Sequence, residues 1–135
     1  MDESTKQDRY FIVTGNDAKG SRSDAAVIAL RRCYVCRQAD PNIGMTDSDP
    51  LLYVDQIVSH CANTPDYLLP NTPLKEAIFR DLLAGGNEPQ TPDDISQRLS
   101  ERWAVAPYPR DISSPVIRKL LEGTAAYGIS KVSKT

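Results

Sequence analysis

The sequence has little of what marks membrane, secreted or strongly charged proteins. Its apolar runs are short, so no segment is long enough to cross a bilayer. The first six residues, Met1–Lys6, are polar and lack the basic start and apolar stretch of a secretory signal. Its three cysteines are an odd number and too few for a disulfide scaffold. We therefore expect a cytoplasmic protein with reduced thiols and no membrane partner.

Neither sign of charge dominates the chain. It carries 16 basic and 18 acidic residues, a net charge of −2, which argues against binding a polyanion through overall basicity. Residues 1–69 hold 7 basic and 10 acidic residues, whereas residues 70–135 hold 9 basic and 8 acidic residues. Any contact with nucleic acid must therefore come from a local patch, and the second half is better placed to supply one.

The first half of the chain predicts a strand and two helices. Residues 1–9 are expected to form a flexible, solvated tail, and Tyr10–Thr14 is expected to form a short strand. A helix is predicted after Ser23-Asp24, with an apolar face made by Ala26, Val27, Leu30, Cys33 and Tyr34. A second helix is predicted from Ser48 or Asp49, with Pro50 at its first position and an apolar face made by Leu51, Val54, Ile57, Val58 and Cys61.

The second half predicts three short helices with clear start and stop signals. The first begins at Thr72-Pro73 and ends at Gly85-Gly86, because glycine permits left-handed backbone. The second begins at Thr91, with Pro92 at its first position and Asp94 completing a capping box. Its expected buried face is Ile95, Leu99 and Trp103.

A third helix and a strand complete the pattern. The helix begins at Ser113-Ser114-Pro115 and ends at Gly123. Residues 125–132 predict a strand, either in a hairpin or paired with the N-terminal strand. The whole pattern predicts a mainly α fold with a small β component. We expect one compact domain over residues 10–135, with a strand and two helices over 10–69 and a second unit over 72–132.

Three short capped helices followed at once by a strand resemble the winged helix-turn-helix superfamily, over Thr72–Val132. This resemblance implies a winged-helix-like three-helix core in which the helix from Ser114 to Glu122 lies in the major groove of DNA. It implies a small DNA-binding protein, with a role in transcription regulation. The residues that it places near DNA are Ser113, Ser114, Arg118 and Lys119 on the helix, and Lys131 and Lys134 at the wing.

Three other side chains of the second half have two interpretations each. Arg98 and Arg102 would either contact the phosphate backbone or simply suit the negative C-terminal end of their helix. Tyr108, between Pro107 and Pro109, would either anchor a protein partner or cover the edge of the core. The alternative function is therefore a protein-interaction module, with a partner chain or a second copy bound and no nucleic acid.

The cysteines and the single histidine form two pairs, Cys33 with Cys36 and His60 with Cys61, which together match the ligands of a Cys₃His zinc site. Cys33 and Cys61 each continue an apolar helical face, where a cysteine behaves as a small hydrophobic residue. Adjacent residues on a helix point about 100° apart, which separates His60 from Cys61. The sequence thus predicts core packing and no cofactor, with zinc-stabilised structure and a redox dithiol as alternatives.

No pattern of catalytic residues is present. The loop Gly15–Ser21 follows an expected strand, but it lacks the Lys and Ser or Thr that complete a phosphate-binding P-loop. With one histidine in the sequence, neither a Ser-His-Asp set nor a histidine metal cluster is available. We therefore expect that the protein is not an enzyme.

Overall fold

A computed structural model shows a mainly helical protein with a small sheet, as the sequence predicts. It describes residues 8–13, 25–39, 50–64, 67–104, 111–123 and 128–132. In chain order the elements are β1 (Tyr10–Ile12), α1 (Ala25–Ala29), α2 (Tyr34–Ala39), α3 (Pro50–Ser59), the 3₁₀ helix η2 (Cys61–Asn63), α4 (Leu74–Ala84), α5 (Pro92–Arg102), α6 (Ser114–Leu121) and β2 (Ile129–Lys131).

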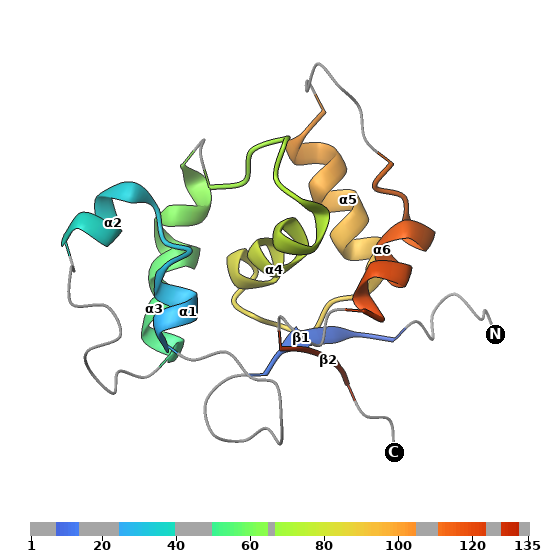
Figure 1. Cartoon of the computed structure of the whole chain (residues 1–135), viewed down its shortest axis with the longest axis horizontal. Coiled ribbons are helices and arrows are strands. Elements are labelled where there is room, and N and C mark those ends of the chain that lie inside the picture. Colours follow the sequence, from blue (N-terminus) through green and yellow to red (C-terminus); the bar gives the residue numbers. More distant parts are fainter. Residues whose placement is uncertain are drawn as a thin grey trace.

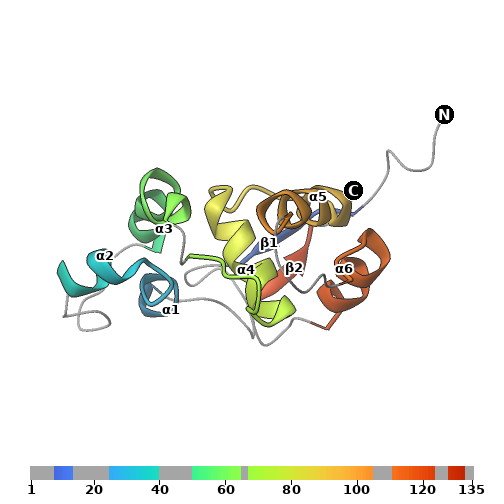
Figure 2. The same cartoon turned by 90° about the horizontal axis from the view of Figure 1, so that it is seen from above.

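Helix α4 lies at the centre of the molecule. The N-terminal helices α1, α2 and α3 lie on one side of it, and α5 and α6 lie on the other (Figures 1 and 2). Ile78, Phe79 and Leu82 of α4 are completely buried, and they belong to the same core cluster as Ile57 of α3 and Ile117 of α6. The N-terminal and C-terminal helices therefore share one hydrophobic core.

The start of α5 has the capping box that the sequence predicts. The Thr91 hydroxyl accepts a hydrogen bond of 3.1 Å from the Asp94 backbone N–H, and the Asp94 carboxylate accepts one of 3.2 Å from the Thr91 backbone N–H. The predicted buried face is also confirmed, because Ile95 and Leu99 are fully buried and Trp103 is nearly so. Helix α5 is thus held at its first turn by its own side chains and along its length by the core.

The two strands pair with each other although they lie at opposite ends of the sequence. Strand β1 runs antiparallel to β2, with Tyr10 opposite Lys131 and Ile12 opposite Ile129. Tyr10 also forms a β-bridge with Gln90, in the segment between α4 and α5. Of the two arrangements predicted for the C-terminal strand, a hairpin or pairing with the N-terminal strand, the structure has the second.

The single helix predicted after Ser23-Asp24 is wrong, because the chain bends between α1 and α2. The backbone N–H of Arg32 bonds to the Ala29 carbonyl, and its guanidinium Nε donates to the same oxygen at 3.0 Å. The predicted apolar face is therefore wrong at Val27, Leu30 and Tyr34, which are exposed, and right at Cys33, which is buried. Ile28 and Ala29, which lie outside the predicted face, are buried together with Cys33.

The expectation that Cys61 continues the second helix is also wrong. Helix α3 ends at Ser59, and His60 has φ −138° and ψ −62°, outside the helical region. Cys61 then begins η2. His60 and Cys61 therefore do not stand on one regular α-helix, and the 100° separation expected between them does not apply.

Several sequence predictions lie outside the described residues. These are most of the tail, over residues 1–7, the loop Gly15–Ser21, the partner candidate Tyr108 and the wing residue Lys134. In the parts of the chain that are described, every helix is too short or too polar to cross a membrane.

Candidate metal centre

Cys33 and Cys36 lie on the turn that leads into α2. Cys33 immediately precedes the helix, and its carbonyl accepts a hydrogen bond of 3.0 Å from the Arg37 backbone N–H. Cys36 follows in the first helical turn, so the two side chains lie on the same side of the chain. The backbone N–H of Cys36 donates to the Cys33 sulfur. The bend after Arg32 thus creates a knuckle in which two thiols converge.

His60 and Cys61 approach the same point from the end of α3. The His60 backbone N–H still donates to the Gln56 carbonyl, at 3.0 Å, as it would in a continuing helix. The Thr64 hydroxyl donates to the Cys61 carbonyl at 2.7 Å and closes the following turn. Because the chain turns at His60, both side chains face the knuckle.

The four side chains form one compact cluster. The ligand atoms of Cys33, Cys36, His60 and Cys61 all lie within 4.8 Å of one another. The His60 Nδ1 atom lies 3.5 Å from the Cys33 sulfur and 3.5 Å from the Cys36 sulfur. In a tetrahedral zinc site with Zn–S of about 2.3 Å and Zn–N of about 2.0 Å, sulfur and nitrogen are about 3.5 Å apart. The two distances therefore match the edges of a zinc tetrahedron.

The thiols differ in their tendency to ionise. Burial opposes ionisation of Cys33, but hydrogen bonds from the Cys36 backbone and from neighbouring side chains outweigh it and lower the pKa of Cys33 to about 7. Burial raises the pKa of Cys61 to about 12, and burial together with the nearby Cys33 raises the pKa of Cys36. Three thiolates at this spacing repel one another, so a cation is needed to ionise all three.

A buried arginine lies beside the cluster. Arg32 is 3% exposed, and its guanidinium donates to Gln56 of α3 at 2.8 Å and lies over the Tyr53 ring at 4.7 Å. Its positive charge favours ionisation of Cys36. A Zn²⁺ ion with three thiolates and one neutral histidine carries a net charge of −1. The Arg32 charge is therefore suited to balance the charge of the loaded site.

Two of the predicted DNA-binding residues are exposed on α6. Arg118 and Lys119 are both exposed, and α6 itself lies on the opposite side of α4 from the N-terminal helices (Figure 2). Ser113 precedes α6 and is exposed, whereas the hydroxyl oxygen of Ser114 is buried. Lys131 is exposed on β2 and pairs with Asp8 at 3.5 Å. We retain Arg118 and Lys119 as the candidates for a polyanion contact.

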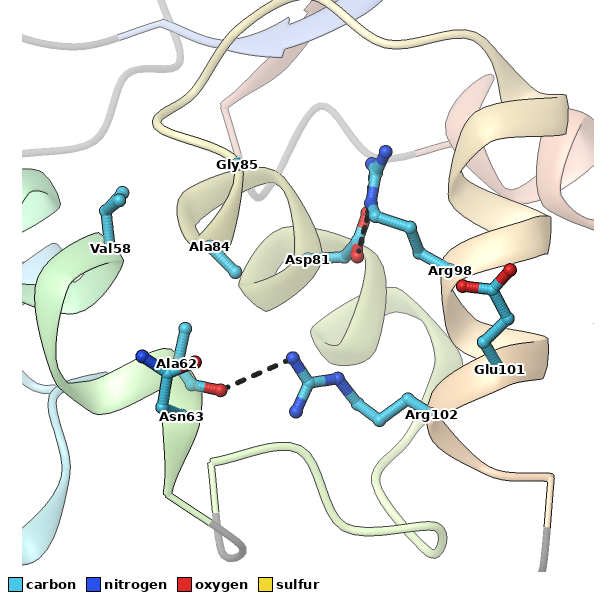
Figure 3. Close-up of a pocket in the computed structure, with 9 residues that line it drawn as sticks. All are labelled: Val58, Ala62, Asn63, Asp81, Ala84, Gly85, Arg98, Glu101 and Arg102. Atoms are coloured by element: carbon cyan, nitrogen blue, oxygen red, sulfur yellow. Dashed lines mark hydrogen bonds and ion pairs between the residues drawn. The ribbon is translucent and has the colours of Figure 1, made fainter.

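Arg98 and Arg102 make contacts within the protein instead. The Arg98 guanidinium donates to the carboxylate of Asp81, at 3.0 and 3.1 Å from Nε, and to Gln90. Arg102 reaches from α5 across a groove to the Ala62 carbonyl at 3.4 Å (Figure 3). This groove, of about 500 Å³, is lined by residues of α3, η2, α4 and α5. Both arginines therefore belong to α5 and contact other parts of the protein, so we do not group them with the candidate polyanion residues on α6.

Sequence reasoning identified the four residues of the cluster but not their arrangement. The ligand types were evident, since all three cysteines and the only histidine fall in two short segments. The assumption that both segments are continuous helices concealed their convergence. Chain breaks at Arg32 and His60, which the helical periodicity does not reveal, bring the side chains together.

Comparison with protein-family models, with curated proteins and with solved structures finds no match for this chain.

Proposed function

We propose that this protein is a zinc-binding domain in which Cys33, Cys36, His60 and Cys61 hold one Zn²⁺ ion. The observation that supports this proposal is the convergence of four ligand atoms within 4.8 Å, from two segments separated in the sequence. Four protein ligands fill a tetrahedral coordination shell and leave no position for water or substrate. The metal would therefore have a structural role, and the protein would not be a zinc enzyme.

The orientation of His60 favours a metal over the two other interpretations of the cysteines. The side chain of His60 is exposed, so water is available to its ring, yet Nδ1 is turned toward two sulfurs. A redox dithiol needs only Cys33 and Cys36, and simple core packing needs no histidine. A zinc site uses all four side chains.

Elemental analysis of the purified protein tests the proposal directly. We expect one zinc ion per chain, and replacement by Co²⁺ should produce the absorption bands of a tetrahedral thiolate site. Cys36→Ser and Cys61→Ser should each lower the zinc content, whereas the control Ser59→Ala, beside the site, should not. A wild-type protein that is folded and contains no stoichiometric zinc after growth and purification with the metal present would refute the proposal.

DNA binding through α6 is a second candidate function. It is favoured by the exposure of Arg118 and Lys119 and by the absence of cover from the described N-terminal helices. A winged-helix-like arrangement of α4, α5, α6 and β2 would present these residues to a major groove. Under this proposal β2 would be a strand of the wing, and its partner would be β1 instead of a second strand of a C-terminal hairpin.

Polarisation titrations with mixed duplex DNA test the second candidate. The double variant Arg118→Ala/Lys119→Ala should weaken binding and reduce its salt dependence, because fewer counterions are released. Arg37→Ala, which removes one exposed charge from α2 together with its hydrogen bond to the Arg32 carbonyl, is the control for loss of charge away from α6 and should bind as wild type does. Absence of binding by wild-type protein at low salt would exclude this candidate.

Binding of a protein partner, the alternative to DNA, is favoured by a different surface. Large apolar side chains are exposed on the N-terminal helices and on the turn after α1, namely Leu30, Tyr34, Val35, Leu51 and Leu52. Co-purification from lysate with and without nuclease separates the two interpretations: a partner that persists after nuclease treatment is bound by protein contacts.

A further inference from the structure

The segments that carry the candidate zinc ligands also connect the N-terminal helices to α4 and α5. Arg31, two residues before Cys33, donates from Nε and Nη2 to the two carboxylate oxygens of Glu76 on α4, at 3.0 and 2.9 Å. Its guanidinium also lies 4.9 Å from the centre of the Phe79 ring. A bidentate pair of this kind fixes both position and orientation. The turn that carries Cys33 is therefore connected to α4 through the Arg31 side chain.

The second ligand segment makes a similar connection to α5. Ala62 directly follows Cys61, and its carbonyl is the group that accepts the hydrogen bond from Arg102 across the groove (Figure 3). This contact is longer and more exposed than the Arg31–Glu76 pair, so we expect it to contribute less. Each of the two ligand pairs is therefore next to a residue that contacts the C-terminal helices.

The elements between these contacts are too short to be stable alone. Helices α1 and α2 contain five and six residues, and η2 contains three. Isolated helices of this length are not stable in water, because nucleation costs more than a few hydrogen bonds return. Their arrangement must come from the core, from the polar contacts with α4 and α5, or from a bound metal. Metal binding that orders such segments contributes its free energy to folding.

We infer that the metal centre acts as a clamp between the two halves of the fold. Binding of the metal to the Cys₃His site would fix the turn between α1 and α2, which contains Arg31, and would also fix η2. It would thereby hold the N-terminal helices against α4 and α5. This inference rests on the proposed zinc site. Thermodynamic linkage is reciprocal. If metal binding favours formation of the Arg31–Glu76 pair by a given factor, formation of the pair must raise the affinity for the metal by the same factor.

Competition with a chromophoric chelator measures the coupling in the full-length chain. Arg31→Ala and Glu76→Gln should each weaken zinc binding by about fivefold or more, a coupling in the range found between linked sites. Arg31→Lys keeps the charge but loses the bidentate geometry, so it should have an intermediate effect and serves if Arg31→Ala does not fold. Arg102→Gln should have a smaller effect. Asp8→Asn, which breaks the Lys131 pair on β2, is the control and should leave the affinity unchanged.

The reverse measurement follows unfolding of the C-terminal helices through the single tryptophan. Trp103 is 8% exposed and donates from its indole to the Leu68 carbonyl at 3.1 Å, so its fluorescence reports on the packing at the end of α5. The destabilisation caused by Glu76→Gln should be larger in zinc-loaded protein than in protein stripped by chelator.

The outcomes separate the clamp from the zinc site itself. The clamp would be overturned if wild type, Arg31→Ala and Glu76→Gln all contained stoichiometric zinc and bound it with affinities within twofold of one another. That result would leave the proposal of a zinc site intact. Absence of zinc from folded wild-type protein would overturn both. Weakened zinc binding in the Glu76 and Arg31 variants, with an unchanged Asp8→Asn control, supports the clamp.

Discussion

Arg98 of α5 holds the buried carboxylate of Asp81 on α4 and so links the two longest helices described. The Asp81 side chain is 4% exposed, whereas that of Arg98 is 38% exposed. The pair therefore has a buried anion and a cation that reaches water. This asymmetry decides which member of the pair the fold can lose.

We predict that Arg98→Met destabilises the protein more than Asp81→Asn does. Removal of Arg98 leaves a buried carboxylate without its partner, which costs about 2–4 kcal/mol after allowance for the exposed side of the pair. Asp81→Asn instead leaves a cation that water can solvate, and it removes the buried charge. Chemical denaturation of both variants measures the difference. Equal losses of unfolding free energy would contradict this account of the pair.

The stability of wild type relative to Asp81→Asn should depend on pH. Burial raises the pKa of Asp81 above its usual 3.8, although the hydrogen bonds from Arg98 partly offset the effect. Since the folded-state pKa is the higher one, this group favours folding most at low pH, and that contribution is lost as the pH rises through the folded-state pKa. Asp81→Asn should therefore gain stability relative to wild type as the pH rises from below 3.8 through the folded-state pKa of Asp81. Ser100→Ala, at an exposed position without a titratable group, is the control and should show no such trend.

Removal of metal should lower the melting temperature of the protein. With one ligand lost, as in Cys61→Ser, we expect a loss of about 2–3 kcal/mol, which corresponds to a fall of roughly 5–15 °C. Chelator should produce a similar fall in wild type and little further change in the variant. Calorimetry with and without added zinc measures both. An identical melting temperature for chelated and zinc-loaded wild type would argue against a structural metal.

The capping box of α5 predicts a separate, metal-independent contribution to stability. Thr91→Ala removes the acceptor for the Asp94 backbone N–H and should cost about 1 kcal/mol. Ser100→Ala, at an exposed position on the same helix, should change stability by less than about 0.5 kcal/mol. Denaturant titrations of the two variants, with and without zinc, should give the same difference. A loss in Ser100→Ala as large as in Thr91→Ala would contradict a specific role for the cap.

The sequence predicted the C-terminal helices well because their signals are local. Thr91, Pro92 and Asp94 specify the start of α5 within four residues, and Gly86 ends the preceding helix with a φ of 76°. Apolar spacing then identified Ile95 and Leu99 as buried. No tertiary contact is needed to interpret these signals.

The N-terminal helices were predicted less well because their breaks depend on distant partners. Arg32 stabilises the bend after α1 by bonding to Gln56, which lies 24 residues away, and by covering the Tyr53 ring. A sequence pattern shows Arg32 as one more polar position on a continuous helix. The candidate metal site depends on that bend, so its residues were evident from the sequence while their convergence was not.

The pairing of β1 with β2 has a consequence for dissecting the protein. A fragment that contains only α4, α5, α6 and β2 would lose the antiparallel partner of Ile129 and the bridge from Tyr10 to Gln90. Strand β2 would then have unpaired backbone N–H and C=O groups, and such exposed strands promote aggregation. Expression of the C-terminal helices by themselves should thus give insoluble material, and a fusion that supplies Tyr10–Ile12 in trans or through a linker should restore solubility.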